Sequence, residues 1–386
     1  MSFVSDKVKK LPPYLFSELQ RKKKKMEASG ADVIDLGIGA PDLPAPEFIY
    51  EKLVEEAKKP LNHKYSVYNG IPSFREAVAE FYKNQYGVEL EPETEVLALI
   101  GSKEGLANLV QAVTNPGDTV LIPDPGYPVY RTAVHLAGGV SVSLPLDVNN
   151  GYIPLYEKLG AEELEQSKLM ILNYPSNPTA ATVELDTFTE AVSFAEKNNI
   201  LLVNDAAYDL VTFDNYKSPS VLQVPGAKKQ AVEFGSLSKS FNMTGWRIGF
   251  AVGNKEVIQA LSTLKSNIDT CQFIPVQKAA EEALRSDLST VKENNRIYKK
   301  RMDKLHKALN ELGIKTGKPR GTIFVWAKVP EGYTSAGFAD KVLEKAGVIV
   351  TPGNAFGENG EGFIRLALSV SEDRLDEVIS RFKKVL

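Results

Sequence analysis

Residues 231–249 read AVEFGSLSKSFNMTGWRIG and join a short, mostly apolar run to a loop rich in serine and glycine. The run AVEF lacks the strict alternation of a half-exposed strand and is typical of a parallel strand that is buried on both faces. The polar segment GSLSKS begins where that strand is expected to end. Because ligands of open α/β sheets bind beyond the carboxyl ends of the strands, this segment is a candidate binding loop.

The same order of apolar run and polar loop recurs through the middle of the chain. The further runs are residues 96–100 (VLALI), 119–122 (TVLI), 169–172 (LMIL) and 200–203 (ILLV). Helix-like segments separate the runs, and this alternation is typical of a doubly wound, mostly parallel sheet. We therefore expect residues 46–285 to form one large α/β domain.

The two ends of the chain have a different pattern. Beyond residue 285, a charged helical stretch at 291–312 precedes mixed strands and helices that end with a helix from Glu372. This mixture predicts a smaller α+β domain over residues 286–386. Residues 1–45, which contain IDLGIGAPD, are expected to pack with it.

Composition limits the classes of function. The 386 residues include 46 basic and 49 acidic ones, so the formal net charge of −3 gives no general attraction to nucleic acid or anionic membrane. No stretch approaches the roughly 18 apolar residues of a membrane span, and the N-terminus has no apolar core of signal-peptide length. The single cysteine, Cys271, fits a reducing cytoplasm. The three widely spaced histidines do not have the spacing of metal ligands, so no metal is expected.

Lys239 is the candidate nucleophile. It lies near Ser236 and Ser238, and Arg247 follows it by eight residues. A lysine amine reacts only when it is deprotonated, which burial or neighbouring cations favour. Hydroxyl groups and a guanidinium are suited to binding phosphate. A serine-rich loop with one lysine is usually only a loop, but the string 235–249 as a whole is far more specific.

Three residues near the ends of two other predicted strands are suited to surround an aromatic cofactor ring. Asp205 follows a buried run, where a carboxylate is costly unless it is paired, and a protonated pyridine nitrogen is one such partner. Tyr208 and Asn177 are suited to donate hydrogen bonds to a phenolate oxygen of the ring. The alternatives are a helix cap for Asp205, core packing for Tyr208 and a simple Asn-Pro turn for Asn177.

Four further candidates complete this set. Ser102 and the backbone of Lys103 stand between a predicted strand and a helix, where N–H groups bind phosphate. Tyr127, in PDPGYP, is suited to stack on a ring. Arg365 interrupts the apolar run FIRLAL and needs an anionic partner, which is either a substrate carboxylate or an internal one.

In order along the chain, these residues resemble the fold-type I pyridoxal-phosphate aminotransferases of class I and II, and the resemblance covers essentially the whole sequence. Asn177 and Asp205 are 28 residues apart, and Asp205 and Lys239 are 34 apart. The resemblance implies that Lys239 holds pyridoxal 5′-phosphate as a Schiff base and moves protons. It assigns the ring nitrogen to Asp205 and the phenolate oxygen to Asn177 and Tyr208. It implies a phosphate site made of Ser102, Lys103, Ser236, Ser238 and Arg247.

The family also implies a homodimer with shared active sites. Tyr65, in KYSVYNGIPSFR, resembles a tyrosine that reaches the phosphate of the neighbouring subunit, and Tyr68 is the alternative. Thr270 is a second residue expected to reach across. The resemblance therefore implies that a single chain lacks part of its own site.

Within the family, strings such as GSKEGLANL, LNYPSNPTAAT and NDAAYDLVTFD are similar to the LL-diaminopimelate aminotransferase group. Ala40 departs from that group, which usually has aspartate there, and leaves the amino donor open. Ala180 stands where most members have glycine, which is expected to be tolerated if its φ is negative. The pattern of the group assigns four residues to the substrate: Tyr14, Gly39, Asn177 and Arg365.

The resemblance implies ping-pong transfer of an α-amino group from an amino acid to a 2-oxo acid such as 2-oxoglutarate. The donor candidates are LL-diaminopimelate, aspartate, alanine, methionine and aromatic amino acids. The same site is also suited to β-elimination, as in carbon–sulfur lyases, which would release pyruvate and ammonia without an acceptor. A regulator that only senses the cofactor would carry an added DNA-binding domain, for which we expect no spare length before the catalytic fold.

Overall fold

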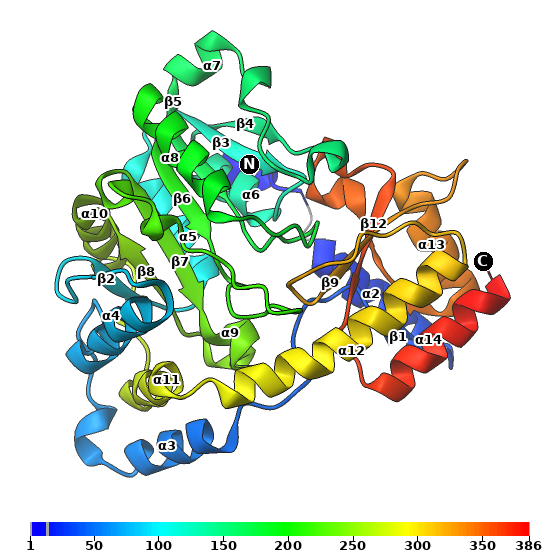
Figure 1. The fold of residues 1–386 in the computed structure, drawn as a ribbon, viewed down its shortest axis with the longest axis horizontal. Coiled ribbons are helices and arrows are strands. Elements are labelled where there is room, and N and C mark those ends of the chain that lie inside the picture. The colour runs from blue at the N-terminus through cyan, green and yellow to red at the C-terminus, as the bar shows by residue number, and fades with distance from the viewer. Residues whose placement is uncertain (1, 13–14, 386) are drawn as a thin grey trace.

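The computed structural model describes residues 2–12 and 15–385, and a seven-stranded sheet is its largest element (Figure 1). The strand order is β2-β8-β7-β6-β5-β3-β4, in which β8 is antiparallel to both neighbours and the other pairs are parallel. The strands are β2 (Val96–Leu99), β3 (Thr119–Asp124), β4 (Val140–Pro145), β5 (Ser167–Leu172), β6 (Leu201–Asp205), β7 (Ala231–Ser236) and β8 (Gly249–Gly253).

Helices cover both faces of this sheet. One face is covered by α5 (Ser102–Val113), α6 (Val129–Ala137) and α10 (Lys255–Ser266). The other face is covered by α4 (Pro72–Tyr86), α8 (Leu185–Asn198) and α11 (Ile274–Arg285), with α3 (Glu47–Ala57) packed against α11. Two short helices, α7 (Ala161–Glu165) and α9 (Leu237–Ser240), lie in connections. Burial on both faces explains why the strands are apolar runs without alternation.

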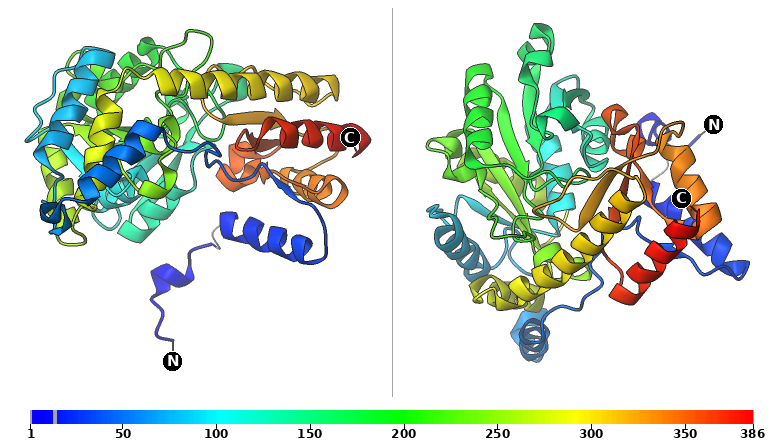
Figure 2. Two further views of the ribbon diagram at one scale, coloured as in Figure 1. Left: turned by 90° about the horizontal axis from the view of Figure 1, so that it is seen from below. Right: turned by 45° about the vertical axis from the view of Figure 1, so that its right-hand side comes forward.

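A second apolar cluster lies in the C-terminal region. Its sheet is three-stranded and antiparallel in the order β11-β12-β9. Figure 2 shows the long helix α12 running from the larger sheet region to this smaller one. The elements are α12 (Ser289–Glu311), β9 (Phe324–Lys328), α13 (Ser335–Ala346), β10 (Val348–Ile349), β11 (Thr351–Pro352), β12 (Phe363–Ala367) and α14 (Glu372–Val385).

The N-terminal segment joins this smaller region by a strand pair. Its elements are α1 (Asp6–Lys9), α2 (Leu15–Ala28) and β1 (Ile34–Asp35). β1 pairs with β10 in parallel, and Leu36 belongs to the same apolar cluster as α12 and α14. These contacts support domain boundaries near residues 45 and 285, which stay a prediction.

The predicted α/β fold class is confirmed. Five of the predicted runs form β2, β3, β5, β6 and β7. β4 was not predicted because its residues, VSVSLP, alternate along a half-exposed edge strand. β8 was not predicted either, because its short run, GFAVG, directly follows the cofactor-loop motif.

The expected backbone at Ala180 is wrong. We expected alanine to be tolerated there through a negative φ, but φ is +57°. A tight loop forces this value, because the Ala180 N–H donates to Ser176 O at 3.1 Å and the Ser176 N–H donates to Ala181 O at 2.9 Å. Ala180 therefore carries the left-handed strain that glycine avoids, at a cost of about 1–2 kcal/mol.

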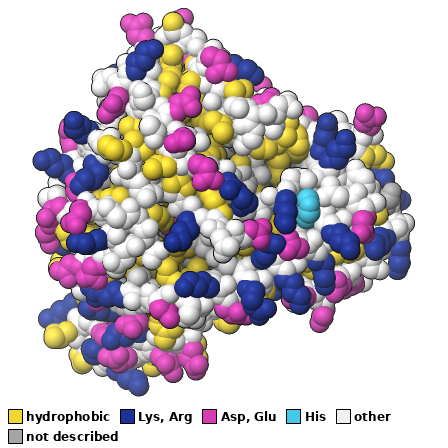
Figure 3. Space-filling view, in the orientation of Figure 1, with side chains coloured by type: hydrophobic (Ala, Val, Ile, Leu, Met, Phe, Trp, Pro, Cys, Tyr) yellow, Lys and Arg dark blue, Asp and Glu magenta, His cyan; other side chains and the backbone are white. Residues whose placement is uncertain are grey.

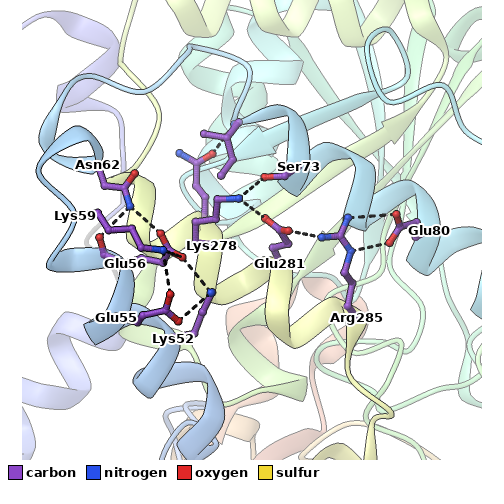
Figure 4. Close-up of polar contacts among 12 residues, drawn as sticks. Lys52, Glu55, Glu56, Lys59, Asn62, Ser73, Glu80, Lys278, Glu281 and Arg285 are labelled. Carbon is purple, nitrogen blue, oxygen red and sulfur yellow. Dashed lines mark hydrogen bonds and ion pairs between the residues drawn. The ribbon is translucent and has the colours of Figure 1, made fainter.

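Charged side chains of both signs are interspersed over the face shown in Figure 3. Figure 4 shows how such pairs join neighbouring helices: Arg285 of α11 bonds Glu80 of α4, and Lys278 bonds Ser73. Exposed pairs of this kind contribute at most about 1 kcal/mol each, so they serve mainly to align the helices.

Through residues 2–12 and 15–385, no helix combines the length and apolar character that crossing a membrane requires. The same residues contain no group of three or more His, Cys, Asp or Glu side chains suited to a metal ion.

Candidate active site

A cavity of about 460 Å³ lies where the parallel strands of the large sheet end. The loops after β2, β3, β5, β6 and β7 supply one wall, and residues 38–40 with β9 and β12 supply the other. Twelve of the residues predicted from the sequence line this cavity: Gly39, Ser102, Lys103, Tyr127, Asn177, Asp205, Tyr208, Ser236, Ser238, Lys239, Arg247 and Arg365.

Lys239 projects into the cavity from α9, the single helical turn that follows β7. Ser236 begins this turn and accepts a hydrogen bond from the Ser238 N–H at 3.3 Å. The Lys239 ammonium donates to Gly39 O at 2.7 Å. Burial lowers the pKa of Lys239 to about 8, with a further contribution from the cations Arg365 and Arg247. A substantial neutral fraction near pH 8 makes this amine a nucleophile.

Asp205 ends β6 and is buried beneath the cavity. Its Oδ2 accepts a hydrogen bond from the Tyr130 hydroxyl at 2.7 Å, whereas no group of the described chain donates to the buried Oδ1. Burial raises the pKa of Asp205 to about 6, against the opposing effects of Tyr130, the Ala207 backbone and Lys239. A buried carboxylate oxygen without a donor is costly. Oδ1 therefore calls for a donor from a bound group, such as a protonated ring nitrogen.

Asn177 and Arg365 meet across the cavity. Arg365 Nη1 donates to Asn177 Oδ1 at 2.7 Å, and Nη2 donates to Gly37 O at 2.6 Å. The guanidinium lies 4.2 Å from the centre of the Phe324 ring, which holds its plane. Because Asn177 Oδ1 accepts from Arg365, the NH₂ end of this amide is left to donate to a ligand.

Asn173 fixes the loop that carries Asn177. Its NH₂ group donates to Asp205 O at 2.6 Å, and its Oδ1 accepts from the Asn177 N–H at 2.7 Å. The ends of β5 and β6 are thereby tied together under the cavity.

A cradle for a phosphate group lies at the N-terminus of α5. Its N-cap is Gly101, so no side chain caps the first N–H groups of the helix. A Cβ at Gly101 would lie 2.1 Å from Arg247 Nη2, and a Cβ at Gly249 would lie 2.7 Å from Gly235 O. Arg247 itself donates to Thr244 O at 2.9 Å. Glycines thus let backbone N–H groups and a guanidinium converge, as an anion requires.

Two aromatic residues complete the wall. The Tyr208 ring packs edge-on against Phe324, with centres 5.4 Å apart, and the Lys239 ammonium lies 5.9 Å from the Tyr208 ring centre. Tyr127 packs edge-on against Tyr130 at 5.7 Å. A flat ring between these side chains would contact apolar surface on one side and polar groups at its edges.

Two predicted residues are not brought to the cavity. Tyr65 and Thr270 line a separate hollow together with Tyr68 and Ile268. The Tyr65 side chain is 89% exposed. Tyr14 lies outside the described residues.

Sequence reasoning missed Tyr130, Asn173 and Phe324, all of which line the cavity. Tyr130 lies in the first turn of α6, three residues after Tyr127 in the preceding loop, and could have been noticed as a second tyrosine next to the motif PDPGYP. Asn173 opens the motif NYPSNP and could have been noticed with Asn177. Phe324 had no local signal, because its place depends on how β9 packs against the large sheet.

The cavity residues fit pyridoxal phosphate. Asp205 Oδ1 needs a donor where a ring nitrogen would lie, the glycine-lined cradle suits a phosphate, and Lys239 supplies an amine between them. These groups belong to separate elements of one cavity, so a single ligand with an acidic tail and a cationic ring satisfies all of them.

Comparisons with known proteins agree with this chemistry. The family model for aminotransferase class I and II matches residues 31–382. Two curated relatives are named LL-diaminopimelate aminotransferase. The one from Moorella thermoacetica is 47% identical over 98% of this chain and 97% of its own length, and the one from Maridesulfovibrio salexigens is 48% identical over 99% of both.

A solved structure of substrate-bound BacF from Bacillus subtilis is 41% identical, covers 100% of this chain and 98% of its own, and has a TM-score of 0.96. The match extends over the large sheet and the C-terminal region alike. The chain therefore belongs to the class I and II aminotransferases and is an enzyme that depends on pyridoxal 5′-phosphate.

Proposed function

We propose that this aminotransferase takes its amino group from LL-diaminopimelate and gives it to 2-oxoglutarate, as a step of lysine biosynthesis. The observation that carries this proposal is the full-length identity of 47% and 48% to two relatives with that name. The site supports the class of reaction, since a nucleophilic lysine, a buried carboxylate and an anion cradle share one cavity.

We assign the chemical steps to three groups of the chain. When bound, pyridoxal phosphate supplies an electron sink for the bonds of the substrate α-carbon. Lys239 Nζ would hold the cofactor at rest and, once released, would take up the proton of the substrate α-carbon. Asp205 Oδ1 would keep the ring nitrogen protonated, and the Tyr130 hydroxyl holds Oδ2 in place. Burial of Asp205 and Tyr130 excludes water, which would strengthen the interaction between the Asp205 carboxylate and the ring nitrogen.

Binding of the cofactor is assigned to the loops of the large sheet. Ser102, the Lys103 backbone and Arg247 would hold the phosphate, aided by the hydroxyls of Ser236 and Ser238. The NH₂ group of Asn177 and the hydroxyl of Tyr208 would donate to the ring oxygen, and Tyr127 would contact the ring. Arg365 donates to Asn177 Oδ1 and so orients the Asn177 amide with its NH₂ group available to the ring oxygen, which supports the assignment of Asn177.

We assign the substrate α-carboxylate to Arg365 and Asn177, with Gly39 and Tyr14 near the substrate. Gly37 and Asn177 each fix one terminal nitrogen of the Arg365 guanidinium, which sets the plane of its donors before a carboxylate arrives. A guanidinium in a fixed plane binds a carboxylate through two parallel hydrogen bonds. The Lys239 contact with Gly39 O joins the two halves of this site.

One observation favours a second group of donors. Ala40 lines the cavity without a charge, beside Ile38 and Phe324. An apolar wall at this place suits methionine or an aromatic amino acid better than a substrate with a charged distal group. The alternative proposal is therefore an aminotransferase for methionine or aromatic amino acids.

We also propose a homodimer in which Tyr65 and Thr270 enter the neighbouring site. Four aromatic or branched side chains are exposed and line one hollow: Tyr65, Val67, Tyr68 and Ile268. Contiguous exposed apolar surface of this kind marks association surfaces.

We propose a cytoplasmic location, in keeping with the single cysteine.

An amino-donor screen with 2-oxoglutarate tests the donor. LL-diaminopimelate, aspartate, alanine, methionine and phenylalanine are compared by kcat/KM, with Lys239→Ala as the inactive control. We expect LL-diaminopimelate to have the highest kcat/KM. Activity with methionine or phenylalanine and none with LL-diaminopimelate would replace the proposed donor by the alternative. A separate incubation without acceptor uses S-methylcysteine, whose β-carbon carries a thiolate leaving group; release of methanethiol, pyruvate and ammonia would identify a β-lyase.

A further inference from the structure

A buried hydrogen-bond relay lies beneath the cavity and has no part in the chemistry described above. It begins at Glu233 in β7, whose side chain is 1% exposed. Its Oε1 accepts from Tyr82 OH at 2.9 Å and from Ser220 Oγ at 2.5 Å. Its Oε2 accepts from Asn204 Nδ2 at 2.8 Å and from the Val221 N–H at 3.1 Å. Four donors on two oxygens are suited to an ionised carboxylate rather than to a protonated one.

Glu233 determines which way the Asn204 amide points. An amide has a donor end and an acceptor end, and the acceptor Glu233 Oε2 selects the NH₂ end of Asn204. Asn204 Oδ1 consequently points the other way and accepts from the Tyr174 N–H at 3.2 Å. Asn204 is fully buried, so no water is available to satisfy the reversed orientation.

The Tyr174 N–H lies in the loop 173–178, which carries Asn177. The neighbouring Asn173 bonds Asp205 O and the Asn177 N–H, and Asn177 bonds Arg365. The Tyr174 hydroxyl donates to Tyr152 O at 2.5 Å, so the side chain of Tyr174 is held as well as its backbone. Glu233 is therefore connected, through the Asn204 amide and the backbone of residues 173–177, to the residue whose amide is assigned to the cofactor and the substrate.

We propose that Glu233 is a positioning residue of the active site, which sets the Asn204 amide and through it the loop 173–178 that carries Asn177. The inference rests on the proposed roles of Asn177 and Arg365. It differs from a purely structural role because it predicts an effect on ligand binding that a conservative variant with matched donors and acceptors does not have.

Glu233→Met tests the relay with a side chain of similar length, because it removes the acceptor that selects the NH₂ end of Asn204. The Asn204 amide is then no longer held, and a turned amide opposes the Tyr174 N–H with its own NH₂ group. A buried donor without an acceptor moves the loop, so we expect the KM for the amino donor and the Kd for pyridoxal phosphate each to rise about tenfold.

Glu233→Gln is the conservative variant that keeps the relay. Its amide oxygen accepts from Asn204 Nδ2 and the Val221 N–H, and its NH₂ group donates to the hydroxyl oxygens of Tyr82 and Ser220, which accept as well as donate. We expect KM and Kd to stay within about threefold of wild type. The midpoint of thermal unfolding falls, because the hydrogen bonds to a charged group are lost.

Tyr82→Phe is the matched control. It removes a donor from the same carboxylate, but from Oε1 rather than from the Oε2 that orients Asn204. We expect a lower unfolding temperature with KM and Kd unchanged. The KM of each variant is measured on the dimer loaded with the cofactor. The Kd is measured separately, by titrating pyridoxal phosphate into the stripped protein and following the absorbance.

The relay is overturned if Glu233→Met raises KM and Kd no more than Tyr82→Phe does, or if folded Glu233→Gln raises them as much as Glu233→Met does. The cofactor titration separates this result from a failure of the proposed donor. A wild-type protein that binds pyridoxal phosphate but does not use LL-diaminopimelate contradicts the donor alone, and the Kd series still decides on the relay.

Discussion

Asp205 is the residue whose charge most directly determines the chemistry. Its buried Oδ1 has no donor among the described residues, and we assign the ring nitrogen to it. Asp205→Asn keeps the shape of the side chain but replaces the negative carboxylate, which would keep the ring nitrogen protonated, by a neutral amide. We expect kcat to fall about 10²–10³-fold while the cofactor stays bound, because a preset charge is lost. Steady-state kinetics and the absorbance of bound cofactor measure both effects.

Tyr130→Phe is the control for this prediction, because it removes only the hydrogen bond to Oδ2. We expect a loss of kcat of about tenfold or less, as for one hydrogen bond to a charged group. Equal losses in the two variants would show that the environment of Oδ2, and not the charge of Oδ1, is what matters.

The pKa of Lys239 sets the pH range in which the protein takes up its cofactor. Burial, Arg365 and Arg247 lower this pKa from 10.5 to about 8. Only the neutral amine attacks an aldehyde, and the neutral fraction grows as pH rises through the pKa. We expect the rate of covalent uptake by stripped protein to increase from pH 6 and to level off above about pH 8.

Borohydride trapping followed by peptide mass spectrometry measures this uptake and identifies the modified lysine. Free Nα-acetyl-lysine under the same conditions provides the comparison for an unperturbed amine. A rate for the protein that still climbs beyond pH 10, as for the free amine, would contradict the environment described for Lys239.

At the scale of elements, the junction of β2 and α5 joins a strained turn to the phosphate cradle. Gly101 has φ +78°, and an added Cβ would lie 2.1 Å from Arg247 Nη2. Gly101→Ala therefore strains the backbone and moves the guanidinium. We expect pyridoxal phosphate to bind at least about tenfold more weakly, from the loss of one charge-assisted contact.

Gly87→Ala is the matched control at the end of α4. Gly87 also has positive φ, +67°, but nothing lies within 4 Å of an added Cβ. We expect destabilisation of about 1 kcal/mol by thermal or urea unfolding, with cofactor affinity unchanged. If both alanines weakened the cofactor equally, a general loss of stability would explain the effect and the cradle would not.

Much of the fold was predictable because a strand that is buried on both faces has an apolar run in its own sequence. The runs at β2, β3, β5, β6 and β7 are apolar because both faces of the sheet are covered. The order of the strands and the reversal of β8 were not predictable, because they arise from pairings between distant segments. Ala180 shows a similar limit, since the loop around it, and not its residue type, determines its φ.

The site was predictable where one residue type has one chemical use. Lys239, Asp205 and Arg365 are costly in apolar surroundings without a partner, so their positions were informative. Glu233 is also buried, yet the run AVEF that contains it predicts only a strand. Its partners Tyr82, Asn204 and Ser220 come from three separate segments that meet only in the folded chain.

At the scale of the whole molecule, the proposed dimer completes each site with Tyr65 from its neighbour. In one chain Tyr65 is 89% exposed and lies outside the cofactor cavity. Lys239→Ala and Tyr65→Ala are each expected to be nearly inactive. After the two are unfolded, mixed and refolded together, random pairing gives heterodimers with one intact site, or about a quarter of wild-type activity.

Ile268→Glu provides the companion test, because it places a charge on the same exposed surface. We expect monomers by sedimentation velocity and a loss of activity. Mixed variants that recover no activity, while still forming dimers, would place Tyr65 outside the neighbouring site.

A single-turnover experiment without acceptor tests most directly that the chain is an aminotransferase acting through Lys239. Protein loaded with pyridoxal phosphate is mixed with excess LL-diaminopimelate, and the 2-oxo product, ammonia and cofactor absorbance are followed. We predict a burst of 2-oxo product equal to the bound cofactor, no ammonia, and further turnover only when 2-oxoglutarate is added. Continuous release of ammonia, or the same burst from Lys239→Ala, would contradict the account.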